Sequence, residues 1–127
     1  ASCIMGYNLA HSSTCMPHRA QYVVGPKTSS SHAQGLIALY KGWLPMIAQE
    51  PEKSGYDELQ AELGLESSLI EAINKLKVDL NINYNLGTLG LKKDDIMGLV
   101  ENVNGNLDLD PVYQGEKSLY NLIEKSF

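Results

Sequence analysis

Apolar residues recur at helical spacing along almost the whole of this chain. The clearest case lies between residues 32 and 49, where one face of an expected helix carries Leu36, Leu39, Tyr40, Trp43, Leu44 and Ile47. Sustained alternation of apolar and polar residues, which is typical of strands, is almost absent. The sequence therefore predicts an all-α fold, a helical bundle of about five or six helices without a sheet.

Prolines, glycines and serines divide this pattern into segments. Pro17 must kink or restart the first helical region, because proline lacks an N–H and clashes with the preceding turn. A run of serines, residues 29–31, can cap the second region. We expect helices over about residues 2–23, 32–49, 56–63, 69–80, 92–103 and 116–125. Between them we expect breaks at 25–29 and 50–55, turns over 81–90 and a loop over 105–111.

Length, charge and cysteine content limit the class of protein. The 127 residues suit one domain with a real core, and no apolar run is long enough to cross a membrane. The N-terminal residues lack the charged and then apolar pattern of a signal peptide, and a net charge of −5 without a basic cluster argues against nucleic-acid binding. Cys3 and Cys15 form no disulfide framework, so we expect buried free thiols and a cytoplasmic location.

Charge is unevenly distributed along the chain. Residues 1–49 contain Arg19, Lys27 and Lys41 but no acid, whereas fifteen acids against seven lysines leave a net charge of −8 from Glu50 onward. An acid-free third suggests an interior segment or a surface that faces an anionic ligand. The chain also opens Ala1-Ser2-Cys3, without an initiator methionine, from which we expect a fragment of a longer protein.

Two histidines, His18 and His32, are the best candidates for a functional site. They lie fourteen residues apart, and each begins an apolar helical pattern. Imidazole is the commonest protein ligand of transition metals, but two histidines do not complete a site, and a structural hydrogen-bonding role is the alternative. His11, Cys15, His18 and Tyr22 also follow the spacing of one helix face, either as a core seam or as a polar cavity wall.

Other catalytic patterns are not found in the sequence. It has no Gly-x-Ser-x-Gly elbow, no Gly-x-Gly-x-x-Gly fingerprint and no phosphate-binding loop. Asp94 and Asp95 read as a charge pair at a helix N-terminus, and Asp108 and Asp110 read as loop acids.

The histidine spacing and the tail resemble one known family. The segment from His18 to His32 is similar to the part of iron-containing (group III) alcohol dehydrogenases that carries His-x-x-x-His and then a final ligand histidine fourteen residues after the first. The stretch Leu89-Gly90-Leu91 followed by an acid and Ile96, and the later Asp110-Pro111, are similar to that family's C-terminal region. The resemblance covers residues 1–127, as a C-terminal all-helical metal-binding domain of the dehydroquinate-synthase-like fold.

The resemblance implies a metal-dependent oxidoreductase that interconverts an alcohol and an aldehyde or ketone with NAD or NADP. It implies that His18 and His32 bind Fe²⁺ or Zn²⁺ and that Tyr22 acts as a catalytic residue where the family often has its second histidine. Arg19 would bind a phosphate or carboxylate of the substrate, with an ordinary surface arginine as the alternative. The partners it implies are a small alcohol or aldehyde, a separate N-terminal nucleotide-binding domain and a second copy in a homodimer.

Departures from the family keep two other functions open. Tyr22, Ala33 and Val112 stand where the family usually has histidine, glycine and arginine, and its Asp-x-x-x-His motif is absent. We therefore expect this chain to be inactive without further residues. The alternatives are a lyase or cyclase of the dehydroquinate-synthase type and a non-catalytic helical interaction module.

Overall fold

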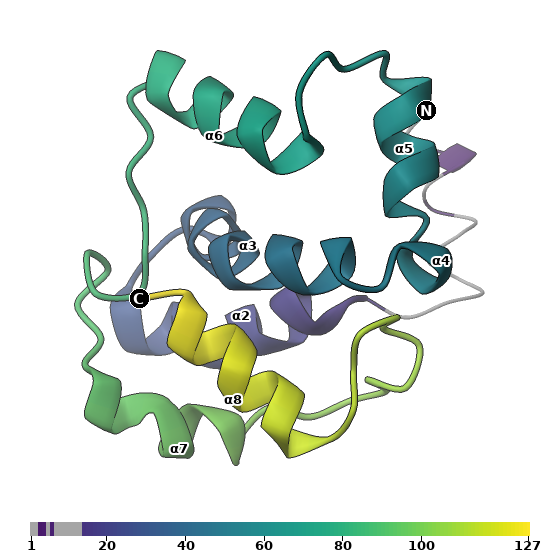
Figure 1. Ribbon diagram of the computed structural model, residues 1–127. Coiled ribbons are helices and arrows are strands. Elements are labelled where there is room, and N and C mark those ends of the chain that lie inside the picture. Colours follow the sequence, from purple (N-terminus) through teal and green to yellow (C-terminus); the bar gives the residue numbers. More distant parts are fainter. Residues whose placement is uncertain (1–2, 5, 7–13) are drawn as a thin grey trace.

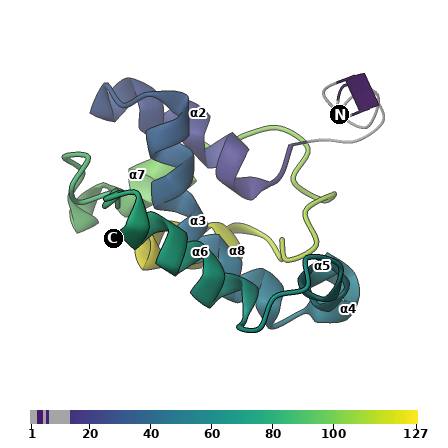
Figure 2. The same ribbon diagram turned by 90° about the horizontal axis from the view of Figure 1, so that it is seen from above.

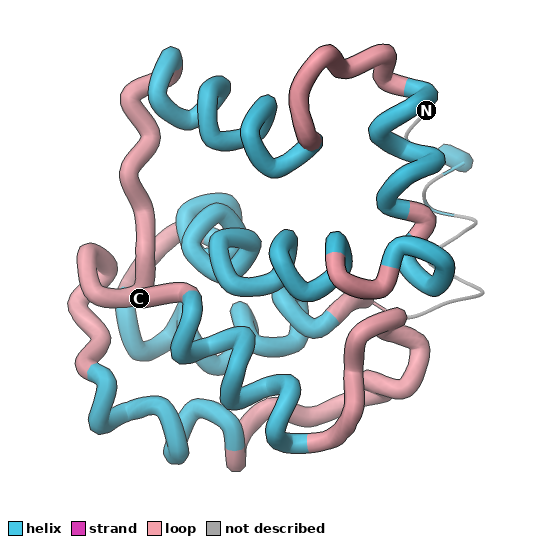
Figure 3. Tube along the Cα trace, viewed as in Figure 1, coloured by secondary structure: helices cyan, strands magenta, loops and turns pink. Residues whose placement is uncertain are grey.

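The computed structural model describes residues 3, 4, 6 and 14–127, and this part of the chain is helical without a strand (Figures 1 and 3). The all-α class is thus confirmed, although the described residues form seven α-helices and one 3₁₀ helix instead of five or six helices. None of these helices is both long and apolar enough to span a membrane. The elements are α2 (Met16–Thr28), α3 (His32–Ala48), α4 (Pro51–Ser54), α5 (Tyr56–Glu62), α6 (Leu69–Asp79), η1 (Lys93–Asp95), α7 (Ile96–Val100) and α8 (Glu116–Lys125).

Helix α3 lies at the centre of the packing (Figure 1). It contacts α2 along one side and α8 along another, and α7 packs on α8. Figure 2 shows α2 and α3 as crossing neighbours that are joined by the short turn between them. Among the side chains fully buried in the core are Met16, Leu39, Leu86, Leu99, Leu122 and Ile123.

Two glycines of α3 allow its neighbours to approach closely. A Cβ at Gly42 would overlap the carbonyl oxygen of Leu122 in α8 and lie 2.7 Å from Ser126 Oγ. A Cβ at Gly35 would overlap the buried side chain of Gln21 in α2. Because Gly35 follows His32 by one turn and Gln21 follows His18 by about one turn, this contact sets the distance between α2 and α3 beside the two histidines.

Helix α2 starts later and ends later than the sequence predicts. Pro17 restarts the helix: Cys15 is the extended N-cap residue, and the proline occupies the first turn, where its missing N–H costs no helical hydrogen bond. The expected loop over 25–29 is wrong, because α2 continues through Pro26 to Thr28. Gly25 has no Cβ to clash with the Pro26 ring, and the hydroxyl of Thr28 donates to the carbonyl of Val24 at 2.9 Å.

Two further differences in the helices have local causes, and the cysteines also differ from the prediction in their burial. The expected break at 50–55 contains the short helix α4, which begins at Pro51 and ends at Ser54, because the next residue, Gly55, adopts the left-handed conformation with φ of 65°. The helix expected over 92–103 shortens to η1 and α7, because the side-chain amide of Asn102 donates to the carbonyl of Gly98 at 2.7 Å. Cys3 is exposed instead of buried, and Cys15 is half-buried, although both are free thiols. The remaining helices agree with their predicted ranges to within about one residue.

The buried carboxylate of Asp110 joins three distant segments. One of its oxygens accepts from the backbone N–H of Met16 at 2.7 Å and from the indole N–H of Trp43 at 3.2 Å. The other accepts from the backbone N–H of Val112 at 3.1 Å. Asp110 is therefore more than the loop acid that the sequence suggested: it fixes the start of α2 against α3 and against the loop before α8. A negative group at a helix N-terminus also interacts favourably with the helix dipole.

We predict that Asp110→Ala destabilises the chain by about 3 kcal/mol or more, because it leaves buried N–H donors without an acceptor. Urea unfolding followed by circular dichroism measures the change. Asp108→Ala is the matched control: Asp108 is exposed, and its replacement should change the free energy of unfolding by about 0.5 kcal/mol or less. Equal effects of the two substitutions would contradict the anchoring role of Asp110.

Candidate metal-binding histidine pair

The two candidate histidines come from the first turns of two adjacent helices. His18 lies in the first turn of α2, and His32 is the first residue of α3. The start of α3 is fixed by a capping box, in which Ser31 Oγ accepts from the N–H of Gln34 at 3.3 Å and the Gln34 side chain accepts from the N–H of Ser31 at 2.9 Å. The serine cap that the sequence predicted is therefore confirmed at Ser31.

The two imidazole rings converge. His18 Nδ1 lies 3.3 Å from His32 Nε2, and the ring centroids are 5.2 Å apart with 46° between the planes. Two nitrogens that bind one ion at about 2.1 Å must lie about 3.0 to 3.4 Å apart for right-angled to tetrahedral coordination. The observed separation fits this range, so the donor chemistry and the spacing suit a transition metal. An imidazole–imidazole hydrogen bond fits the same separation, if one nitrogen carries the proton and the other accepts it.

Protonation of His18 is unfavourable. Burial lowers the pKa of His18 below its usual value, and repulsion from His32 lowers it further. A depressed pKa keeps the His18 ring neutral, which is the form in which imidazole binds a metal.

Tyr22 lies beside the pair, on its exposed side. Its ring is stacked on His32, with centroids 6.3 Å apart and 24° between the planes, and the residue is 58% exposed. The hydroxyl is thus accessible to a small molecule. His11, the first member of the expected helical stripe, lies outside the described residues.

Cys15 adds little to the candidate site. It precedes α2 as the N-cap residue, so it does not continue one helix face with His18 and Tyr22. Burial raises the pKa of its thiol, which disfavours the thiolate that binds metals. Within residues 3, 4, 6 and 14–127, no group of three or more His, Cys, Asp or Glu side chains is placed to hold a metal ion. At this position the described residues therefore offer two candidate ligands, His18 and His32, which are too few to complete a metal site.

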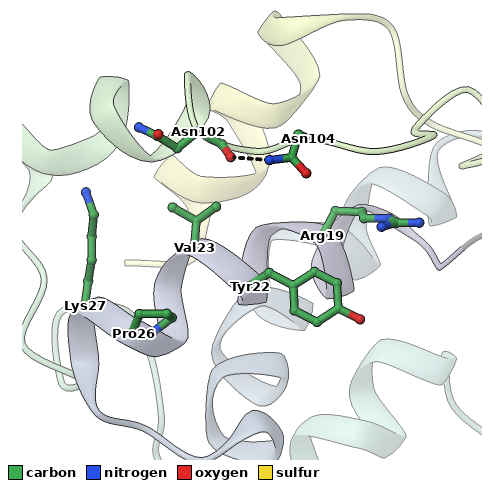
Figure 4. Close-up of a pocket in the computed structure, with 7 residues that line it drawn as sticks. All are labelled: Arg19, Tyr22, Val23, Pro26, Lys27, Asn102 and Asn104. Carbon is green, nitrogen blue, oxygen red and sulfur yellow. Dashed lines mark hydrogen bonds between the residues drawn. The ribbon is translucent and has the colours of Figure 1, made fainter.

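Arg19 lines a pocket that does not include the two histidines. This pocket has a volume of about 380 Å³ and lies between α2 and the loop that follows α7 (Figure 4). Its lining consists of Arg19, Tyr22, Val23, Pro26, Lys27, Asn102 and Asn104. Lys27, Asn102 and Asn104 were not recognised from the sequence, because residues 25–29 were expected to form a loop and residues 102–103 a helix end. Because α2 extends to Thr28, helical spacing places Lys27 on the same face as Arg19, whereas no local spacing indicates Asn102 and Asn104.

Comparison with known proteins does not assign the chain to a family: no protein-family profile, curated protein or solved structure matches it. The function of the chain is therefore inferred from its residues and their geometry.

The lowered pKa of His18 predicts how stability changes with pH. Between the usual histidine pKa of about 6.5 and the lower pKa of the folded state, the unfolded chain binds more protons at this residue than the folded chain, so the free energy of unfolding falls as the pH falls. Above this window the contribution is constant. His18→Gln removes this proton uptake, so the pH dependence of its unfolding should be flatter below pH 6.5 than that of the wild type.

Urea unfolding of both proteins at several pH values between about 4.5 and 8 measures this difference. Parallel curves for wild type and His18→Gln would show that His18 titrates equally in the folded and unfolded states, against the prediction.

Proposed function

We propose that His18 and His32 are two ligands of a catalytic transition metal in an NAD(P)-dependent oxidoreductase that interconverts an alcohol and an aldehyde or ketone. The observation that supports this most strongly is the 3.3 Å approach of His18 Nδ1 and His32 Nε2 from two different helices. Fourteen residues separate them in sequence, as in the iron-containing alcohol dehydrogenases that the chain resembles. His18 is half-buried and His32 is exposed, so solvent or a ligand can reach both rings.

Each residue of the site has a distinct role in this proposal. Fe²⁺ or Zn²⁺, when bound, supplies a Lewis acid for the oxygen of the substrate. His18 and His32 hold neutral rings toward one point, and the depressed pKa of His18 favours its neutral form. The ring of Tyr22 is stacked on that of His32, and its hydroxyl would donate a hydrogen bond to the substrate oxygen.

The proposed enzyme needs more than the described residues. Two ligands hold a metal weakly, so the proposal includes additional ligands from a partner domain or subunit. The same partner would bind the nicotinamide nucleotide, because the described residues contain no strand and so no strand–turn–helix cradle for its phosphates. A reducing, cytoplasmic location belongs to the proposal and is supported by the two free thiols.

We predict that the chain binds one equivalent of Zn²⁺ through this pair. Isothermal titration of the wild type, His18→Ala and His32→Ala should show affinity that falls at least about tenfold with either substitution, since each removes one of two ligands. Tyr22→Phe is the matched control: it keeps both imidazoles and the aromatic ring, so its Zn²⁺ affinity should equal that of the wild type.

Circular dichroism of each variant separates lost binding from lost folding. Equal Zn²⁺ affinity of wild type, His18→Ala and His32→Ala, all folded, would rule out the pair as a metal site.

A further inference from the structure

The pocket beside the histidine pair is built from one continuous face of α2. Arg19, Tyr22, Val23, Pro26 and Lys27 follow the spacing i, i+3, i+4, i+7 and i+8, which places them in a stripe along the helix. The loop after α7 forms the opposite wall with Asn102 and Asn104 (Figure 4). The volume of about 380 Å³ is within the range of small-molecule sites. We call this pocket, defined by these seven residues, the α2 groove.

Positive charge is concentrated in the α2 groove. Arg19 and Lys27 lie eight residues apart, which separates their Cα atoms by about 12 Å along the helix axis. None of the described residues that line the groove is acidic, and residues 1–49 contain no acid at all. The groove therefore favours a ligand that carries negative charge.

The loop after α7 holds the arginine in place. Gly105 has φ of 108°, a conformation that favours glycine, and a Cβ at this position would lie 2.8 Å from Arg19 Cζ. The guanidinium thus lies directly against this glycine, where any larger residue would displace it. Such close packing positions the arginine at one end of the groove, whereas Lys27 lies at the other end.

Between the two cations, the groove offers groups that suit hydroxyls. The side-chain amide of Asn102 donates to Gly98, and that of Asn104 donates to the carbonyl of Asn102 at 3.4 Å. These bonds orient the two side chains on the loop, and amide oxygens accept hydrogen bonds from hydroxyl groups. Val23 and Pro26 supply apolar surface for a short carbon chain.

Tyr22 connects the α2 groove to the histidine pair. It lines the groove and is stacked on His32, so a ligand in the groove lies next to the proposed metal site. We infer that the α2 groove binds the phosphate or carboxylate group of a small hydroxylated substrate, whose alcohol or aldehyde end reaches the histidine pair. The identification of the ligand as a substrate depends on the proposed function, but binding of the anion does not depend on a metal.

Direct binding of glycerol 3-phosphate tests the inference. NMR titration of the metal-free 127-residue chain should show saturable shifts at the backbone amides of Asn102, Asn104 and Lys27, with a dissociation constant of about 1 mM or lower. Lys27→Gln should weaken binding about tenfold, because it removes a charge-assisted contact. Lys41→Gln is the matched control, since Lys41 is an exposed lysine of the same acid-free region that does not line the groove.

A second probe distinguishes the source of the anion. The phosphates of a dinucleotide share this chemistry, so NADP⁺ is titrated in the same way. If NADP⁺ binds at least tenfold more tightly than glycerol 3-phosphate, and Lys27→Gln abolishes NADP⁺ binding, the groove belongs to the cofactor and the inference is overturned. Absence of glycerol 3-phosphate binding, or equal binding by wild type and Lys27→Gln, would also overturn it.

Two separate titrations distinguish this inference from the proposed metal site. Glycerol 3-phosphate is titrated without metal and its binding is tested at Lys27, whereas Zn²⁺ is titrated without glycerol 3-phosphate and its binding is tested at His18 and His32. Failure of Zn²⁺ binding with intact, Lys27-dependent binding of glycerol 3-phosphate would contradict only the metal site. Failure of glycerol 3-phosphate binding with intact Zn²⁺ binding would contradict only the groove.

Discussion

The buried carboxylate of Asp110 is the interaction on which both candidate sites depend. It accepts hydrogen bonds from the start of α2 and from Trp43 of α3, and it lies in the loop that precedes α8. A carboxylate out of water is stable only when its oxygens accept hydrogen bonds. The hydrogen bonds to Asp110 therefore fix the position of the start of α2 relative to Trp43 of α3. The axial position of α2 relative to α3 determines whether the ring of His18 meets that of His32.

Helix α2 presents two different faces to two different neighbours. The face with His18 and Gln21 packs on α3, where Gly35 permits the close approach, and the face with Arg19 and Lys27 borders the loop after α7. The α2 groove requires that the helix continue through Gly25 and Pro26, because Pro26 and Lys27 line it. The glycine before the proline therefore supports the length of the α2 groove.

Features with local causes could be predicted from the sequence, whereas features with distant causes could not. The cap at Ser31 and the helix from Glu116 to Lys125 follow from residues within one or two turns. The convergence of His18 and His32 was accessible because a short turn joins their helices. The burial of Asp110 depends on donors 67 and 94 residues away, and the α2 groove needs a loop about 80 residues distant, so neither has a signature in local spacing.

The most direct test of the central claim is to observe the histidine nitrogens themselves. Long-range ¹H–¹⁵N spectra of the imidazole rings distinguish protonated, unprotonated and metal-bound nitrogens. The geometry predicts that one equivalent of Zn²⁺ changes Nδ1 of His18 and Nε2 of His32 to the metal-bound state, because these are the two atoms that lie 3.3 Å apart. Zn²⁺ binding through the opposite nitrogens, or no change at either ring, would contradict the proposed metal site.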